Sequence, residues 1–105
     1  MEQPLNKNAA ETVIRRAASL PSGLEYRTHC WARMAERLID ALDIVRLLRN
    51  GEMIGSAYKR NGEWRYRFRE RPGNAPLERR DLKVVVVVIS ENRVSCHTVY
   101  RDRNR

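Results

Sequence analysis

Residues 63–70 read EWRYRFRE, in which aromatic residues and arginines alternate between two glutamates. Successive side chains of a β-strand point to opposite faces of the sheet. The two sets expected on opposite faces are Trp64, Tyr66 and Phe68, and Arg65, Arg67 and Arg69. The aromatic face can anchor a core. The arginine face can contact nucleic-acid phosphate, or it can be an ordinary solvated basic surface.

The dipeptide Asn61-Gly62 directly precedes this strand and predicts a tight turn. A type I′ turn needs positive φ at both central residues, which Asn and Gly tolerate best. Residues 53–60 and 63–70 are therefore expected to form a β-hairpin. The polar segment 71–81, which contains Pro and Gly, is expected to be a loop of the kind that often borders a functional site.

Residues 82–89 read LKVVVVVI and are apolar at all positions but one. Such a run predicts a strand that is buried on both faces and therefore lies centrally in the sheet. Glu91-Asn92 is expected to turn the chain into an antiparallel partner at 93–101. Cys96 and Val99 have opposite parity in that partner, so alternation does not decide which of its faces is buried.

The first half of the chain has helical periodicity. The sequence predicts helices at 9–20, with Asn8 and Glu11 as a capping box, at 29–38, capped by Thr28, and at 41–49, capped by Asp40 and ended by Asn50-Gly51. The apolar positions expected to face the core are Cys30, Trp31, Met34, Ala35 and Leu38 in the second helix, and Ala41, Ile44, Val45 and Leu48 in the third. The spacing of the apolar residues changes from helical to alternating at Gly51, so three helices are expected to precede any strand.

These elements predict an α+β fold, in which N-terminal helices pack on one face of an antiparallel sheet of about four strands. At 105 residues the chain has the size of a single domain, 1–105. Residues 1–8 and 102–105 are expected to be flexible tails.

The positive charge is concentrated in the second half of the chain. Residues 1–52 carry eight Lys/Arg and seven Asp/Glu, whereas residues 53–105 carry thirteen and six. A polyanion such as RNA, or an acidic protein, is therefore the expected partner. Of the 21 basic residues 18 are arginine, whose planar fork suits bidentate contacts to phosphate.

The sequence lacks the motifs that are typical of several classes of function. Cys30 and Cys96 are isolated, so neither a zinc site nor a disulfide framework is indicated. No Gly-rich phosphate loop, H-E-x-x-H motif or carboxylate pair is present, and we expect no metal and no small-molecule cofactor. The N-terminus lacks the order of a signal peptide, and no apolar run approaches roughly 18 residues, so a cytoplasmic location without membrane contact is expected.

Several short motifs occur along residues 24–101 in an order that can be compared with known families. They are Tyr26, Thr28-His29, Arg33-Met34, Glu36-Arg37, Asp43, Val45, Leu48, Gly51-Glu52, Trp64-Arg65-Tyr66-Arg67, Val84 to Val88 and Thr98-Val99-Tyr100. The chain thereby resembles an uncharacterised bacterial and phage domain family with an H-x-x-x-R-M-x-x-R helix and a TVY ending. The chain departs from that pattern at Leu38, where the family has Gly, and at His97, where it has an apolar residue.

The domain family is similar in turn to the RelE-type ribonuclease toxins, including the MqsR-like and BrnT-like branches. This resemblance implies helices packed on an antiparallel sheet, metal-independent cleavage of RNA, and restraint by an acidic antitoxin. Such cleavage needs a proton acceptor, a proton donor and cations around the scissile phosphate. The residues expected to supply catalysis are His29, Arg33, Arg37 and Tyr100. Those expected to bind nucleic acid are Lys59, Arg60, Arg65, Arg67, Arg69, His97 and Arg101.

Each of these residues also has a purely structural interpretation. His29 could belong to a loop end, and Arg33 could pair with Glu36 on its own helix. The alternative function is a non-catalytic phage or bacterial protein that binds a host protein or masks a nucleic-acid site. Composition does not distinguish the two hypotheses.

Overall fold

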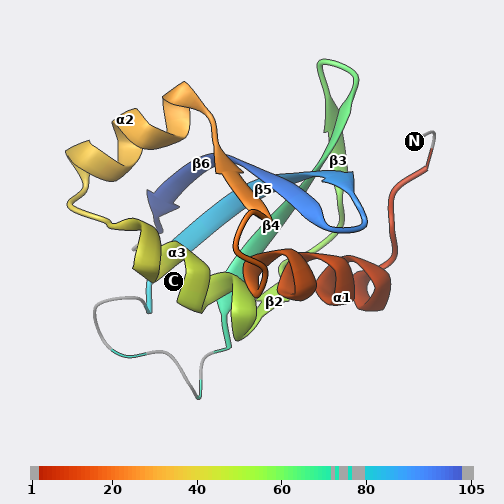
Figure 1. The fold of residues 1–105 in the computed structure, drawn as a ribbon, viewed down its shortest axis with the longest axis horizontal. Helices are drawn as coiled ribbons and strands as arrows, with labels where there is room; N and C mark the ends of the chain where they lie inside the picture. Colours follow the sequence, from red (N-terminus) through yellow and green to blue (C-terminus); the bar gives the residue numbers. More distant parts are fainter. Residues whose placement is uncertain (1–2, 72, 74–75, 77–79, 103–105) are drawn as a thin grey trace.

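The computed structural model describes residues 3–71, 73, 76 and 80–102, and within them it has an α+β architecture, as predicted (Figure 1). The elements in chain order are α1 (Lys7–Ala18), β1 (Leu24–Tyr26), α2 (Thr28–Glu36), α3 (Ala41–Arg49), β2 (Gly51–Met53), β3 (Tyr58–Arg60), β4 (Glu63–Glu70), β5 (Leu82–Ser90) and β6 (Arg93–Arg101). In this part of the chain no helix is long and apolar enough to cross a membrane. Much of the expected loop at 71–81 lies outside the described residues.

The sheet differs from the prediction of about four antiparallel strands. Its order among the described residues is β1-β6-β5-β4-β2, with β3 also paired to β4, which makes six strands. Strand β1 runs parallel to β6, with Leu24 beside Val94 and Tyr26 beside Cys96. It also precedes α2 and α3, so the expectation that three helices come before any strand was wrong. With three residues, β1 is too short for alternation to reveal it.

The hairpin around Asn61-Gly62 is confirmed, but its first strand is divided. Asn61 and Gly62 have φ of 52° and 78°, as a type I′ turn requires. Strands β2 and β3 both pair with β4, and the chain leaves the sheet between them. The departure occurs at Gly55, whose φ of 62° interrupts the extended conformation predicted for residues 53–60.

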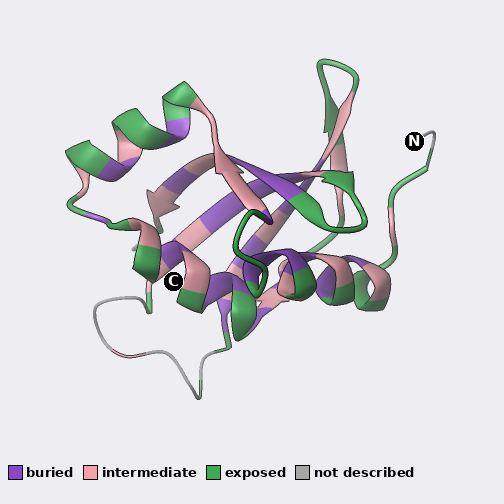
Figure 2. Cartoon of the chain, in the orientation of Figure 1, coloured by how far each residue is buried: buried purple, intermediate pink, exposed green. Residues whose placement is uncertain are grey.

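Strand β5 lies at the centre of the sheet and is buried on both faces, as predicted (Figure 2). Val84 and Val86 are fully buried in the core that the helices cover. Val85 and Val87 are buried too, but they lie outside that core cluster, on the opposite face. Tyr66 on β4 packs in the helix-covered core, as expected of the aromatic face, and Arg67 pairs with Val85 on the other side.

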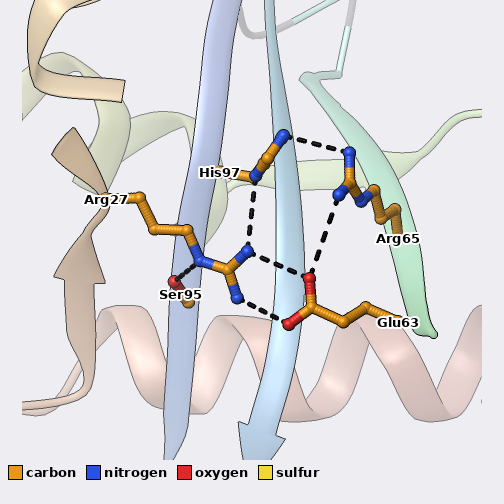
Figure 3. A network of polar contacts seen from close by, with 5 residues as sticks. All are labelled: Arg27, Glu63, Arg65, Ser95 and His97. Atoms are coloured by element: carbon orange, nitrogen blue, oxygen red, sulfur yellow. Dashed lines mark hydrogen bonds and ion pairs between the residues drawn. The ribbon is translucent and has the colours of Figure 1, made fainter. Parts of the chain in front are cut away.

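A β-bulge in β6 explains why alternation could not assign its faces. Val86 pairs with Cys96, and Val85 pairs with Thr98, so His97 is an extra residue without a partner on β5. Cys96 and Val99 consequently both reach the core although they differ in parity. The bulge leaves His97 on the face away from α1 and α3, the same face as Ser95 (Figure 3).

Helix α1 begins earlier than predicted. The side chain of Asn6, rather than Asn8, caps it by accepting from the Ala9 amide at 2.8 Å. Glu11 takes no part in a capping box: its buried carboxylate accepts from the Met53 amide at 3.0 Å and joins α1 to β2. Residues 7–8 therefore belong to α1 rather than to a tail.

Helix α2 buries a narrower stripe than predicted. Cys30 and Met34 are buried, but Trp31 is 52% exposed and its ring lies 5.0 Å from that of Tyr26. Ala35 is exposed, and Leu38 lies beyond the end of the helix with φ of 56°. The reason is that α2 packs beside β6 at the margin of the sheet (Figure 1). Of its residues only Cys30 and Met34 are buried.

Helix α3 has the predicted bounds and cap, with Asp40 and Asp43 forming a reciprocal capping box. Ile44 and Leu48 are buried as expected, and Leu47 is buried in addition. Ala41 and Val45 are only partly buried. All three helices contribute to one core with the sheet, and α1 and α3 lie side by side across it (Figure 1).

Candidate functional site

A network of polar side chains lies on the sheet face opposite α1 and α3 (Figure 3). Its members are Arg27, Glu63, Arg65, Ser95 and His97. Arg27 joins β1 to α2, two members come from β4, and two come from β6. Three separate parts of the chain therefore meet at this site.

Arg27 and Glu63 form the best-defined pair of the network. The two terminal nitrogens of Arg27 donate to the two carboxylate oxygens of Glu63 at 3.0 and 2.9 Å. The Nε of Arg27 donates to the buried Ser95 hydroxyl at 2.9 Å, and its backbone amide donates to the Cys96 carbonyl. The hydrogen bond from Arg27 holds the pKa of Glu63 below its usual range. A bidentate pair of this kind fixes the orientation of both side chains.

His97 lies between two guanidinium groups. Its Nε2 is 3.0 Å from Arg65 and its Nδ1 is 3.4 Å from Arg27. A guanidinium only donates, and a neutral imidazole has one acceptor nitrogen, so only one contact can be a hydrogen bond. We assign the acceptor to Nε2 because that contact is shorter.

Burial and the neighbouring positive charges favour the neutral form of His97. Partial burial is the main cause that lowers its pKa, followed by Arg65, Arg27 and His29, whereas Glu63 acts in the opposite direction. A neutral imidazole can accept a proton, which is the property that a general base needs.

Arg65 is a buried cation, with a residue exposure of 7%. Its nearest carboxylate oxygen, on Glu63, is 3.9 Å away, and its Nε has no hydrogen-bond partner among the described residues. The solvated basic surface considered from the sequence is therefore wrong for this residue. Buried charges are costly unless they are paired, so the position calls for a functional explanation.

His29 belongs to the same region although it comes from a different element. It is the second residue of α2, is exposed, and its ring centroid lies 5.9 Å from that of His97. The first backbone amides of a helix lack intrahelical acceptors and point towards anions that approach its start. Two histidines, two arginines and a helix start thus converge on one face.

Other residues expected at the site have partners elsewhere. Arg33 and Arg37 both form ion pairs with Glu36 on α2, at 2.8 and 3.4 Å, as the structural interpretation suggested for Arg33. Tyr100 lies near the C-terminal end of β6, where it is opposite Lys83 of β5. No recorded contact within the described residues joins these three side chains to the histidine pair.

The residues expected to bind nucleic acid are spread over the sheet. Arg69 pairs with Glu52 on β2, and Arg101 pairs with Asp81. The Lys59 ammonium lies 5.8 Å from the ring centroid of Trp64. Arg60 is exposed at the hairpin end, and the partly buried Arg67 follows Arg65 on the same face, with its Nε unpartnered within the described residues. Of this set, Arg65 and His97 are in direct contact.

Sequence reasoning missed Arg27, Glu63 and Ser95. Glu63 shares strand parity with Arg65, and Ser95 precedes His97 by two residues, so alternation offered a signal for both. Arg27 carried no such signal, because β1 was not recognised.

The two cysteines do not contribute to the site. Both are free and buried, and burial raises the pKa of the Cys30 thiol to about 11. A thiol that remains protonated is a poor nucleophile and a poor metal ligand. Among the residues that the structure describes, no group of three or more His, Cys, Asp or Glu side chains is arranged to hold a metal ion.

Comparison with protein families matches residues 26–101 to DUF4258, described as a domain of unknown function. The chain belongs to the DUF4258 family. The DUF4258 match starts after α1 and contains all five members of the polar network as well as His29. No curated protein and no solved structure gives a significant match.

Proposed function

We propose that this DUF4258 protein is a small RNA-binding protein that cleaves RNA without a metal ion, as RelE-type ribonuclease toxins do. The observation that carries the proposal is the approach of His29 and His97, with ring centroids 5.9 Å apart, beside the guanidinium groups of Arg27 and Arg65. Acid–base pairs with nearby cations are what phosphodiester cleavage requires.

The reaction that suits this arrangement is internal transfer to the ribose 2′-hydroxyl. A base removes the hydroxyl proton as the 2′-oxygen forms a bond to phosphorus. The bond from phosphorus to the 5′-oxygen then breaks, and an acid protonates that oxygen. The products are a 2′,3′-cyclic phosphate and a free 5′-hydroxyl.

Each side chain has a distinct proposed part in this reaction. His97 serves as the proton acceptor, because burial and the two guanidinium groups lower its pKa and so favour the neutral form that has a nitrogen lone pair. His29 then serves as the proton donor. Arg65 and Arg27 hold the phosphate and stabilise the charge that develops on its oxygens.

Glu63 acts as an internal counterion in this proposal. Its carboxylate accepts two hydrogen bonds from Arg27 and lies 3.9 Å from Arg65, so it occupies the surroundings that suit a phosphate. An incoming phosphate competes with Glu63 for the same donors. The pair thereby keeps Arg27 oriented while the site is empty.

The toxin assignment adds an acidic protein partner. It is supported by the resemblance to the RelE-type toxins and by a formal net charge of +8. An acidic antitoxin would neutralise the basic sheet face and block access of RNA.

The test is incubation of the purified protein with a labelled RNA oligonucleotide in the presence of EDTA. We expect discrete cuts that end in a 2′,3′-cyclic phosphate. His97→Ala and His29→Ala should each slow cleavage by about 10² to 10⁴-fold, the usual contribution of one acid–base group. Arg93→Ala is the matched surface control, because Arg93 is exposed and pairs with Glu25.

Absence of cleavage by the folded parent protein would refute the ribonuclease proposal. The alternative is then a non-catalytic protein that binds a host protein or masks a nucleic-acid site. One observation favours it: Trp31 is half exposed beside β1, which is an edge strand of the sheet. Edge strands accept an added strand from a partner, and exposed tryptophans are frequent anchors of interfaces.

A further inference from the structure

A cavity opens where β4 and β5 separate. The ladder between these strands runs from Arg69 beside Lys83 to Tyr66 beside Val86, and both strands continue beyond that last pair. The cavity has a volume of about 240 Å³, and its walls include Glu63, Trp64 and residues 87–89. We infer that this cavity is a nucleobase-binding subsite for the RNA substrate, an inference that rests on the proposed function.

The walls of the cavity have the chemistry that a flat heterocycle requires. Trp64 contributes an indole, and Val88 and Ile89 contribute aliphatic surface, of which Ile89 is 50% exposed. Glu63 and the β5 backbone beyond Val86 supply polar groups at the margin. Single-stranded RNA is recognised by this combination of stacking on aromatic side chains and hydrogen bonding to base edges.

The cavity adjoins the proposed catalytic site through a shared residue. Glu63 lines the cavity and also accepts both hydrogen bonds from Arg27. Trp64 and Val88 line the cavity from the helix-covered side of the sheet, whereas Glu63 belongs to the network on the other side, so the two sites meet at Glu63. We place the phosphate of a nucleotide bound in the cavity on the Glu63 side, towards Arg27. The subsite would select which phosphodiester bond reaches His97.

The charges around the cavity favour a nucleotide over a peptide segment. The Lys59 ammonium lies 5.8 Å from the ring centroid of Trp64, and exposed Arg60 follows it at the hairpin end. Phosphate groups on either side of a bound base would meet these cations and Arg65. A neutral apolar peptide would leave them without counterions.

The first experiment follows tryptophan fluorescence in a Trp31→Phe variant, in which Trp64 is the remaining tryptophan. The probes are the four ribonucleoside monophosphates and ribose 5-phosphate, which carries the same phosphate without a base. We expect the nucleotides to quench Trp64 and ribose 5-phosphate to leave its emission unchanged. Equal responses to both kinds of probe would overturn the inference.

A second experiment measures binding of a single-stranded RNA oligonucleotide to Trp64→Leu and Trp64→Phe variants. Loss of one stacking residue should weaken binding by roughly 5-fold to 150-fold, and the phenyl ring should restore part of it. Binding by a folded Trp64→Leu protein within 2-fold of the parent would overturn the subsite. The fluorescence experiment retains Trp64, so it still decides the matter if that variant does not fold.

The subsite and the ribonuclease proposal fail separately. Base-dependent quenching without RNA cleavage would support the subsite and refute the ribonuclease activity. Cleavage that depends on His97, without any response of Trp64 to nucleotides, would support the activity and refute the subsite.

Discussion

Arg65→Met should make the protein more stable while it weakens RNA binding. The Arg65 side chain is 8% exposed, and within the described residues its Nε has no hydrogen-bond partner. A buried donor without a partner costs about 1 to 3 kcal/mol. Its contact to Glu63, at 3.9 Å, is too long for a hydrogen bond and recovers little of that cost.

Methionine has a similar unbranched stem and removes the charge together with the unpartnered donor. Replacement of buried ionic groups by apolar ones is often neutral or stabilising by about 1 to 4 kcal/mol. The substitution also removes the hydrogen bond from Arg65 to Nε2 of His97, which is worth about 0.5 to 1.5 kcal/mol because His97 is only partly buried. For Arg65→Met we therefore expect a net gain of about 0.5 to 1.5 kcal/mol from removal of the unpartnered donor. Each kcal/mol shifts the melting temperature of a domain of this size by about 4 to 8 °C.

The measurements are thermal and urea denaturation, with RNA binding measured on the same preparation. Arg93→Met is the control, because Arg93 lies on the surface and its replacement should change stability by no more than about 0.5 kcal/mol. A melting temperature for Arg65→Met clearly below that of the parent would refute the reasoning. The contacts of Arg65 to His97 and Glu63 would then outweigh its burial, and Arg65 would be a structural residue.

Three further predictions concern the fold, pH and salt. Val86→Asp places an unpaired carboxylate at a fully buried position and should cost several kcal/mol of stability, enough to unfold a marginal domain. Ile89→Asp on the same strand is the control and should be tolerated, because Ile89 is half exposed. Similar melting temperatures for the two variants would contradict the burial of β5. Because the pKa of His97 is lowered on folding, the unfolded chain binds the proton first, so stability should fall as pH decreases from the ordinary value of 6.5 through the folded pKa. Melting temperatures across that range should depend less on pH in His97→Gln; an unchanged dependence would argue against the shift. RNA binding should weaken by about 0.7 log units per log unit of salt for each phosphate neutralised, and an Arg65→Ala/Arg67→Ala double variant that keeps the parent's slope would exclude these arginines as phosphate contacts.

The elements that could be predicted from the sequence are those set by neighbouring residues. Asn61-Gly62 fixes its turn through the backbone preferences of two residues, and Asp40 caps α3 through a bond to an amide three residues away. The apolar run of β5 likewise predicts that this strand is buried. Each signal is complete within a few residues and needs no information from the rest of the chain.

The features that were missed depend on pairing between distant segments. The three residues of β1 form a strand because they pair with the edge of β6. The bulge at His97 is defined by the pairing of β6 with β5. Strand parity placed Arg65 on the correct face but could not indicate its burial. His29 was selected for its place at a helix start, yet its proximity to His97 depends on the packing of α2 beside β6.

The parallel pairing of β1 with β6 also sets the order in which the site can form during folding. The hairpins β3–β4 and β5–β6 close short loops, whereas Arg27 and His97 are 70 residues apart in the chain. Closure of a longer loop carries a larger entropic cost and requires that its docking edge already exists. In pulsed hydrogen exchange the Arg27 amide, which donates to the Cys96 carbonyl, should gain protection after the amides of β5. A newly synthesised chain would then acquire its complete polar network only at the last step of folding, when most of its basic surface is already in place.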